Sequence, residues 1–265
     1  MTRIIIHGAA GRMGRRLIAL AAEDSEFTLT AAIEAPGHAL LGSDAGTLAG
    51  LEPLGMPLTE QLPPAGSADV VIDFTHPAAT RRLLEAAAAS KLAVVIGTTG
   101  LGEQDHAAID AAAASIGIVQ APNMSLGVNL LMNLAARVAQ TLGPDYDIEI
   151  TEMHHRFKKD APSGTAMGLA QSICQATGRD LQRDLAHGRH GPEAERRQGE
   201  IGMHALRGGD VVGRHTVSYA TLGEEIQLTH IATTRDIFAR GALRAAAWLH
   251  HQPTGRYGMQ DVLGL

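Results

Sequence analysis

The sequence predicts an α/β protein, in which a doubly wound, mostly parallel sheet is followed by a second α+β domain that carries an open mixed sheet. Two observations predict this arrangement. In the first 125 residues, short apolar segments alternate with segments whose apolar residues recur at helical spacing, the pattern of a parallel sheet covered on both faces. After residue 145, strand candidates alternate apolar with polar residues and follow one another with few helices between them.

The first part of the chain contains five strand candidates. They are Arg3 to His7, Phe27 to Ile33, Asp69 to Phe74, Ala93 to Ile96 and Ile116 to Gln120. Helices are expected between several of them. One begins at Arg12, and another runs from Pro77 to Ser90, where proline suits the first helical turn.

The second part begins with a long amphipathic helix from Val128 to Leu142. Strands are then expected at Tyr146 to Ile150, Val211 to Ala220 and Glu225 to Ile231, in a sheet with one face free for a partner. A helix from Arg235 to Leu249 leads a tail that is expected to return to the first domain. We therefore expect a dinucleotide-binding domain at 1–125 and 235–265, and a substrate-binding and oligomerisation domain at 126–234.

Composition limits the class of partner. The net charge of −6 opposes any broad affinity for nucleic acid, which needs a concentrated basic surface. No apolar run approaches the roughly 20 residues that span a bilayer. The segment from Met1 to Gly8 is too short and too soon broken by glycine to be a signal peptide, so we expect a cytoplasmic protein without a membrane partner. The single cysteine, Cys174, is expected to be a buried structural thiol.

A polar segment between Gly178 and Gly202 holds five arginines and two histidines. We favour its interpretation as a solvated, mobile loop. The alternative is a flap that brings positive charge over an anionic site.

A glycine-rich motif, Gly8-Ala9-Ala10-Gly11-Arg12-Met13-Gly14, lies directly between the first strand and the first helix. Glycines at such a turn let the backbone approach a pyrophosphate, and the helix start offers unpaired N–H groups to the phosphates. The motif therefore predicts a Rossmann-type dinucleotide site. The alternative is a tight strand–helix turn with no ligand.

Glu34 ends the second strand, 20 residues beyond Gly14, where an acid can bond the adenosine ribose hydroxyls. An acid at this position opposes a 2′-phosphate and favours NADH over NADPH, although Arg12 can still neutralise a phosphate. Two polar turns follow later strands and are expected to line the nicotinamide pocket. They are Gly97-Thr98-Thr99-Gly100 and Ala121-Pro122-Asn123-Met124.

The most unusual segment begins at Glu152 and holds five basic groups within six positions, His154, His155, Arg156, Lys158 and Lys159. Such a cluster predicts a small anionic substrate. Histidine exchanges protons near neutral pH, and lysine can donate one. A metal site is not expected, because adjacent histidines point in different directions and no spaced acid cluster completes a set of ligands. A basic surface loop is the remaining alternative.

A helix is expected to follow this cluster. Ser163 is a good N-cap candidate, and Gly164 and Thr165 would place backbone N–H groups at the helix start, a suitable site for a substrate carboxylate. A plain capped helix would use the same residues.

The segment from Glu152-Met153-His154-His155 through Lys158 to Asp160-Ala161-Pro162-Ser163-Gly164-Thr165-Ala166 closely resembles the signature of the 4-hydroxy-tetrahydrodipicolinate (dihydrodipicolinate) reductase family. The resemblance covers essentially the entire chain. Its other matching segments are Gly8 to Gly14, Gly42-Ser43-Asp44-Ala45-Gly46, Asp73-Phe74-Thr75, Val95-Ile96-Gly97-Thr98-Thr99-Gly100 and Asp261-Val262-Leu263.

The resemblance implies reduction of 4-hydroxy-2,3,4,5-tetrahydrodipicolinate to tetrahydrodipicolinate, with loss of water, by NADH or NADPH, in the diaminopimelate route to lysine. It assigns acid/base catalysis to His154, proton donation to Lys158 and substrate binding to His155. It also implies that Gly164 and Thr165 hold a carboxylate, and that a homotetramer assembles through the sheets of the second domains.

One position departs from the pattern of many relatives, which have a basic residue directly after the acid at Glu34. Here that residue is Ala35, which favours NADH without excluding NADPH. Two other functions stay open. One is a two-domain dehydrogenase acting on an amino or keto acid, and the other is a catalytically silent nucleotide-binding sensor.

Overall fold

The computed structural model describes residues 1–265, and the chain divides into two compact units. Unit 1 comprises Met1–Leu126 and Asp236–Leu265, and unit 2 comprises Gly127–Arg235. Each boundary differs by one residue from the expected one. The assignment of the cofactor to unit 1 and the substrate to unit 2 stays a prediction.

Unit 1 is built on a seven-stranded sheet with the order β12-β6-β5-β4-β1-β2-β3, in which all neighbours are parallel. The predicted doubly wound sheet is confirmed. Its strands are β1 (Thr2–His7), β2 (Phe27–Ile33), β3 (Leu58–Thr59), β4 (Val70–Asp73), β5 (Ala93–Ile96), β6 (Gly117–Gln120) and β12 (Gly255–Tyr257). The C-terminal tail returns to this unit as expected, because β12 pairs with β6.

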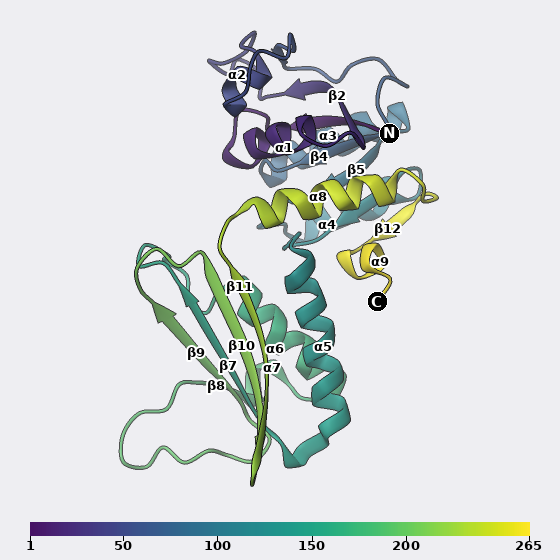
Figure 1. The fold of residues 1–265 in the computed structure, drawn as a ribbon. Coiled ribbons are helices and arrows are strands. Elements are labelled where there is room, and N and C mark those ends of the chain that lie inside the picture. Colours follow the sequence, from purple (N-terminus) through teal and green to yellow (C-terminus); the bar gives the residue numbers. More distant parts are fainter. The chain divides into compact units, whose positions relative to one another are not determined.

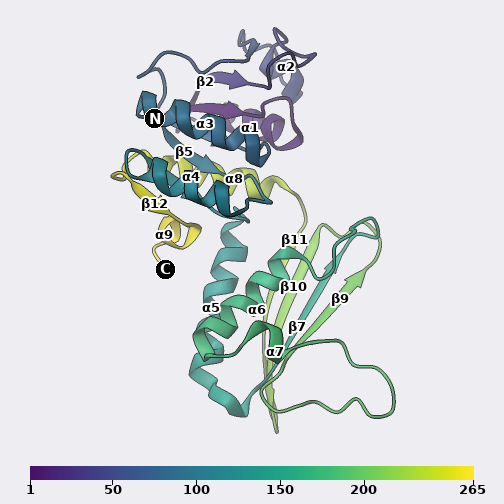
Figure 2. The same cartoon turned by 180° about the vertical axis from the view of Figure 1, so that it is seen from behind.

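Helices cover both faces of this sheet (Figures 1 and 2). Helices α1 (Arg12–Ala22) and α8 (Asp236–Leu249) lie on one face, and α3 (Pro77–Ser90) and α4 (Glu103–Ala113) lie on the other. Successive strand residues point to opposite faces, so Ile4 and Ile6 join one apolar core while Ile5 joins the other. The short helices α2 (Ala45–Ala49) and α9 (Met259–Leu263) complete the unit.

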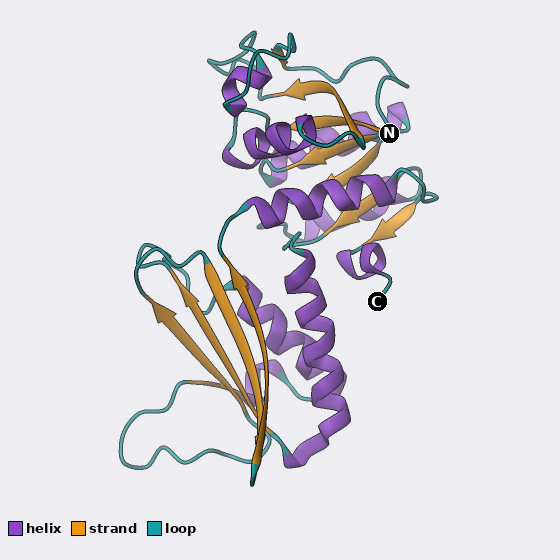
Figure 3. Ribbon diagram, in the orientation of Figure 1, coloured by secondary structure: helices purple, strands orange, loops and turns teal.

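Unit 2 carries the predicted open mixed sheet, in the order β11-β10-β7-β9-β8 (Figure 3). Strand β7 pairs antiparallel with β10 and parallel with β9. The strands are β7 (Asp147–His154), β8 (Leu185–His187), β9 (Ile201–Arg207), β10 (Gly213–Thr221) and β11 (Glu224–Ala232).

Helices α5 (Leu126–Leu142) and α6 (Gly164–Thr177) pack on one face of this sheet, and the short elements η1 (Gly143–Asp145) and α7 (Leu181–Asp184) lie nearby in sequence. Their apolar core joins Leu131 and Ile173 of the helices to Ile150 and Tyr219 of the strands. Cys174 is buried in this core, as predicted, and burial raises the pKa of its thiol. The other face, called here the outer face, exposes Leu206 and Ile231.

Two expectations about unit 2 differ in part from the structure. The strand expected to end at Ile150 continues through His154, because the neighbouring strands pair with this segment, burying Glu152 fully and His154 in part. The segment between Gly178 and Gly202 is not only a loop, since it contains α7 and β8 and leads into β9. Polar residues and Gly202 interrupt the apolar alternation of β9, so periodicity does not predict this strand.

No helix of the chain has both the length and the apolar character that a membrane span requires.

Candidate active site

The polar turns of unit 1 meet at one edge of its sheet. In the strand register, His7 lies beside Ile33 and Asp73, Asp73 lies beside Ile96, and Ile96 lies beside Gln120. Each of these residues ends its strand. The predicted cofactor residues follow them directly, so they gather at the carboxyl edge of a parallel sheet, where such folds bind ligands.

The glycine-rich turn has the geometry expected of a dinucleotide site. Gly8 adopts a φ of +81°, which favours glycine, and Gly11 is the N-cap of α1 without a capping side chain. A Cβ on Gly14 would lie 2.2 Å from the carbonyl oxygen of Gly8, so only glycine lets the helix pack this closely on the turn. Ala9, Ala10, Arg12 and Met13 fill the rest of the turn and the first helical positions.

Glu34 lies directly against this turn. Its Oε2 accepts a hydrogen bond from the Ala10 amide at 3.0 Å, and its Oε1 accepts one from the Ala35 amide at 2.9 Å. Glu34 also lines a groove of about 390 Å³ in unit 1. Glu60, His76 and Arg82 line the same groove, and sequence patterns gave no signal for these three. The groove therefore has the size and the acidic group that an adenosine site needs.

A buried aspartate, Asp73, forms hydrogen bonds with several residues beneath these turns. Asp73 has no exposed surface and accepts hydrogen bonds from the hydroxyls of Thr75, Thr80 and Thr98 at 2.5 to 2.9 Å. His7 Nδ1 lies 2.8 Å from it. Burial opposes ionisation, but these partners together hold the pKa of Asp73 below its ordinary value. The Thr98 hydroxyl, expected to line the ligand pocket, is thus directed inward and also accepts the Thr75 amide at 3.0 Å.

The remaining turns differ in exposure. Thr99 follows Thr98 at the end of β5, where a Cβ on Gly97 would lie 2.3 Å from the Phe74 ring. After β6, Ala121 and Met124 are buried, whereas Pro122 is exposed and Asn123 is partly so. The Asn123 Oδ1 accepts the Ser125 amide at 2.9 Å, which closes the turn.

The basic segment of unit 2 begins on the sheet face that α5 and α6 cover. Glu152 and His154 lie on this face of β7, and the register places Arg207 of β9 beside His154 and His215 of β10 beside Glu152. Glu152 has no exposed surface. Arg207 was not predicted, because β9 has no clear apolar alternation that would predict a strand. His215 had a weak signal, since it shares the alternation of Val217 and Tyr219 in an expected strand.

His154 and His215 are both neutral imidazoles at neutral pH. Burial lowers the pKa of His154, although Glu152 partly offsets this effect. Burial lowers the pKa of His215 to about 4, and the positive charge that His154 gains in acid adds to this effect. The two rings meet edge to face, with centroids 5.1 Å apart, and His215 Nε2 lies 3.0 Å from Ser163 Oγ.

Helix α6 begins as predicted. Ser163 is its N-cap, and its Oγ accepts the Ala166 amide at 3.2 Å. No atom lies within 4 Å of a Cβ built on Gly164, so the first residue of the helix faces open space. Thr165 follows and is partly buried. A helix start with open space beside its first residue suits a carboxylate ligand.

The other basic groups have different surroundings. Lys158 is largely buried, with its side chain 20% exposed, and its Nζ donates to Asp160 Oδ1 at 3.0 Å. His155 is partly buried, and its Nδ1 has no hydrogen-bond partner in the protein. Arg156 and Lys159 are exposed. The cluster is therefore less uniformly positive than its sequence suggests.

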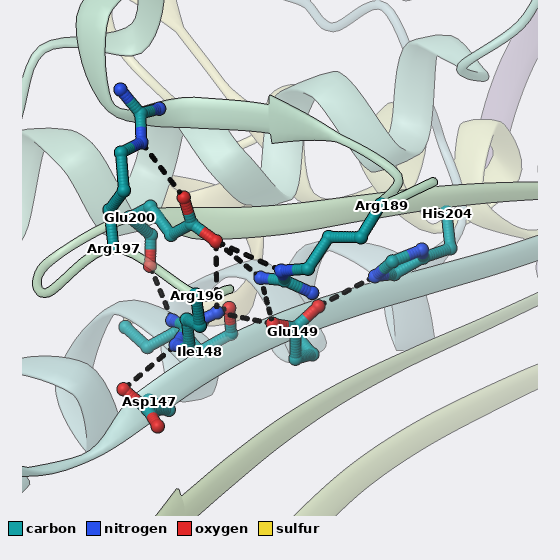
Figure 4. A network of polar contacts seen from close by, with 8 residues as sticks. All are labelled: Asp147, Ile148, Glu149, Arg189, Arg196, Arg197, Glu200 and His204. Carbon is teal, nitrogen blue, oxygen red and sulfur yellow. Dashed lines mark hydrogen bonds and ion pairs between the residues drawn. The ribbon is translucent and has the colours of Figure 1, made fainter. Parts of the chain in front are cut away.

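Arginines of the segment between Gly178 and Gly202 are bound to the outer face of the sheet (Figure 4). Arg189 lies 2.8 Å from Glu149 and also pairs with Glu200, while Arg196 pairs with Glu149 and lies 2.8 Å from Asp147. Glu149 and Glu152 point to opposite faces of β7. Arg189 and Arg196 are therefore held on the outer face and do not lie over His154, whereas most residues from 187 to 199 are exposed, as a solvated loop predicts.

Comparisons with known proteins agree with this geometry. A family model described as "Dihydrodipicolinate reductase, N-terminus" matches residues 2–124, and one described as "Dihydrodipicolinate reductase, C-terminus" matches residues 127–263. A protein of Alkalilimnicola ehrlichii named 4-hydroxy-tetrahydrodipicolinate reductase is 52% identical over 265 residues, which cover 100% of this chain and 99% of that protein.

Solved structures share the fold. A dipicolinate-bound dihydrodipicolinate reductase from Paenisporosarcina sp. TG-14 has a TM-score of 0.77 at 24% identity, covering 98% of this chain and 99% of that one. An amine dehydrogenase from Mycobacterium smegmatis has a TM-score of 0.63 at 14% identity, covering 96% and 94%. The fold alone thus occurs in several dehydrogenases. The two family models and the full-length identity show the family more specifically, and this chain belongs to the dihydrodipicolinate reductase family.

Proposed function

We propose that this protein reduces 4-hydroxy-2,3,4,5-tetrahydrodipicolinate to tetrahydrodipicolinate, with loss of water, in the diaminopimelate route to lysine. Membership of the family and 52% identity to a full-length relative of that name support the reaction. One observation carries the proposal: His154, Lys158 and the open start of α6 occur on one short stretch of unit 2.

The proposed cofactor is NADH or NADPH, with a preference for NADH. When bound, its nicotinamide supplies the hydride. The residues that would hold it are the turn from Gly8 to Met13, Glu34, and the turns at 97–99 and 121–124. Glu34 and Glu60 both line the adenosine groove and oppose a 2′-phosphate, whereas Ala35 offers it no charge. Arg82 is the arginine that lines the same groove, which keeps use of NADPH open.

The proposed substrate is a small dicarboxylate that binds unit 2. The amides at Gly164 and Thr165 would hold one carboxylate, and His155 would contact the ring. The relative from Paenisporosarcina binds dipicolinate, which supports this class of substrate. As hydride reaches the ring carbon that loses its hydroxyl, negative charge develops on the conjugated substrate. Lys158 would stabilise that charge and deliver the balancing proton.

We also propose a cytoplasmic homotetramer that assembles through the outer faces of the unit 2 sheets. Leu206 and Ile231, exposed on that face, would be buried by a second copy. Light scattering would give the mass of the assembly, and a monomer at micromolar concentration would contradict this part of the proposal.

A cofactor-oxidation assay with freshly generated precursor tests the reaction. We expect oxidation of NADH that depends on the precursor and is faster than oxidation of NADPH at the same ionic strength. Oxidation with amino or keto acids but not with the precursor would favour another dehydrogenase. Cofactor binding without any turnover would favour a nucleotide sensor.

A further inference from the structure

The fully buried carboxylate of Glu152 is the centre of a network of hydrogen bonds. Arg207 donates to both of its oxygens, from Nη1 to Oε2 at 2.9 Å and from Nη2 to Oε1 at 2.8 Å. The Ser163 amide donates to Oε1 at 3.0 Å, and His154 Nδ1 lies 2.5 Å from Oε2. Each oxygen therefore has two partners, which is close to its full capacity as an acceptor.

This network determines the charge of Glu152. Burial alone would keep the carboxyl neutral, but the hydrogen bonds from Arg207 and His154 outweigh burial and hold its pKa below the ordinary value. An ionised carboxylate only accepts hydrogen bonds. The proton in the 2.5 Å contact is therefore bonded to Nδ1 of His154. In the neutral ring this leaves the lone pair on Nε2.

We infer that Glu152 and Arg207 are positioning residues that hold His154 as its Nδ1–H tautomer, with Nε2 as the nitrogen that meets the substrate. The same carboxylate fixes the start of α6 through the Ser163 amide, so a single buried charge sets both the proton-transfer group and the carboxylate-binding turn. The inference rests on the proposed function for the identity of the substrate, but not for the position of the proton.

The space around Nε2 agrees with this role. A Cβ on Gly213 would lie 3.2 Å from Nε2, so the bare backbone of β10 leaves that nitrogen uncrowded. The charged groups that act on His154 come from three elements: Glu152 of β7, Arg207 of β9, and Lys158 of the following turn. His215 of β10 packs against the ring and is neutral. His154 thus presents an acceptor at neutral pH, while Lys158 presents a donor.

Long-range ¹H–¹⁵N correlation spectra of the labelled full chain test the inference without any substrate. The His154 signals are assigned by their loss in His154→Gln. We expect the Nδ1–H tautomer at pH 7.5, and a predominant Nε2–H tautomer would overturn the inference. This result decides the question even if no variant of Glu152 folds.

Glu152→Gln provides the second arm. We expect the fixed tautomer to be lost and the His154 titration midpoint to fall further, because the negative charge that favours the imidazolium is gone. Glu149→Gln is the matched control, with the same change on the same strand but on the outer face, and it should leave the His154 signals unchanged. Unchanged His154 signals in Glu152→Gln would overturn the inference.

Kinetics separate this inference from the proposed function. With the precursor, Glu152→Gln and Arg207→Lys should lower kcat about 10- to 100-fold and shift its pH profile, while KM for NADH stays within about twofold. An unchanged kcat and pH profile in Glu152→Gln would overturn the positioning role. If wild-type protein shows the Nδ1–H tautomer but no reduction of the precursor, the proposed function fails and the position of the proton stands.

Discussion

Glu34 at the end of β2 accepts a hydrogen bond of 3.0 Å from the amide of Ala10 in the glycine-rich turn after β1. The contact joins the two parts of the proposed dinucleotide site, the acid that would face a ribose and the turn that would face a pyrophosphate. The Ala35 amide holds the other oxygen of the same carboxylate. The side chain at position 35 is therefore free to change without loss of this contact.

Ala35→Arg should raise the use of NADPH. A guanidinium at this position can pair with the 2′-phosphate, and hydrogen bonds of this charge-assisted kind are worth about 1.5 to 3 kcal/mol. We expect the ratio of kcat/KM for NADPH to that for NADH to rise about tenfold or more. Ala35→Gln adds length without charge and serves as the control. An equal ratio in Ala35→Arg and wild type would contradict the proposed place of the 2′-phosphate.

Lys158→Ala should remove most of the turnover. The proposed proton donor is lost, and general acid catalysis typically contributes about 10² to 10⁴ in rate. We expect kcat to fall at least about 100-fold while the dissociation constant of NADH, measured by its fluorescence, is unchanged. Lys159→Ala, the exposed neighbour, should retain wild-type turnover. Undiminished kcat in Lys158→Ala would take this lysine out of the mechanism.

Gly14→Ala should destabilise unit 1. The added Cβ would lie 2.2 Å from the Gly8 carbonyl oxygen, so α1 must move away from the turn. Overpacking of this kind costs about 1 to 3 kcal/mol in the free energy of unfolding. Gly164→Ala, where the new methyl meets open space, should cost nothing in stability. Urea unfolding measures the stability of both variants. Equal stability of Gly14→Ala and wild type would show that the turn can move to accommodate the added methyl group.

His215 should make the fold sensitive to acid. Its pKa is about 4 in the folded chain and about 6.5 when unfolded, so its contribution to stability is complete above pH 6.5 and is lost as pH falls toward 4. Between pH 7.5 and pH 5 this amounts to about 2 kcal/mol. His215→Gln should lose less stability than wild type over that range, as measured by urea unfolding. The same loss in both proteins would contradict the neutral, buried state of His215.

Local patterns were sufficient to predict the parts of the site that are contiguous in sequence. Strand β2, strand β5 and helix α3 have the predicted bounds, and the N-cap at Ser163 is confirmed, because short-range rules of periodicity and capping determine them. The resemblance of the motif from Glu152 to Ala166 then identified the family, which the comparisons confirm.

The partners of Glu152 could not be predicted in this way. Arg207 follows it by 55 residues and reaches it only because β9 pairs parallel with β7 in one particular register. His215 reaches it from the other side through β10. A shift of one residue in either pairing would turn these side chains to the outer face. Long-range register of this kind leaves no local trace in the sequence.

The central claim is hydride transfer from the nicotinamide to the heterocyclic precursor. Mass spectrometry of the product formed with NADH deuterated at both positions of C4 tests it most directly. We predict that tetrahydrodipicolinate gains a single deuterium, and that NADH is oxidised only when the precursor is present. A product without deuterium, or oxidation that does not depend on the precursor, would contradict the account.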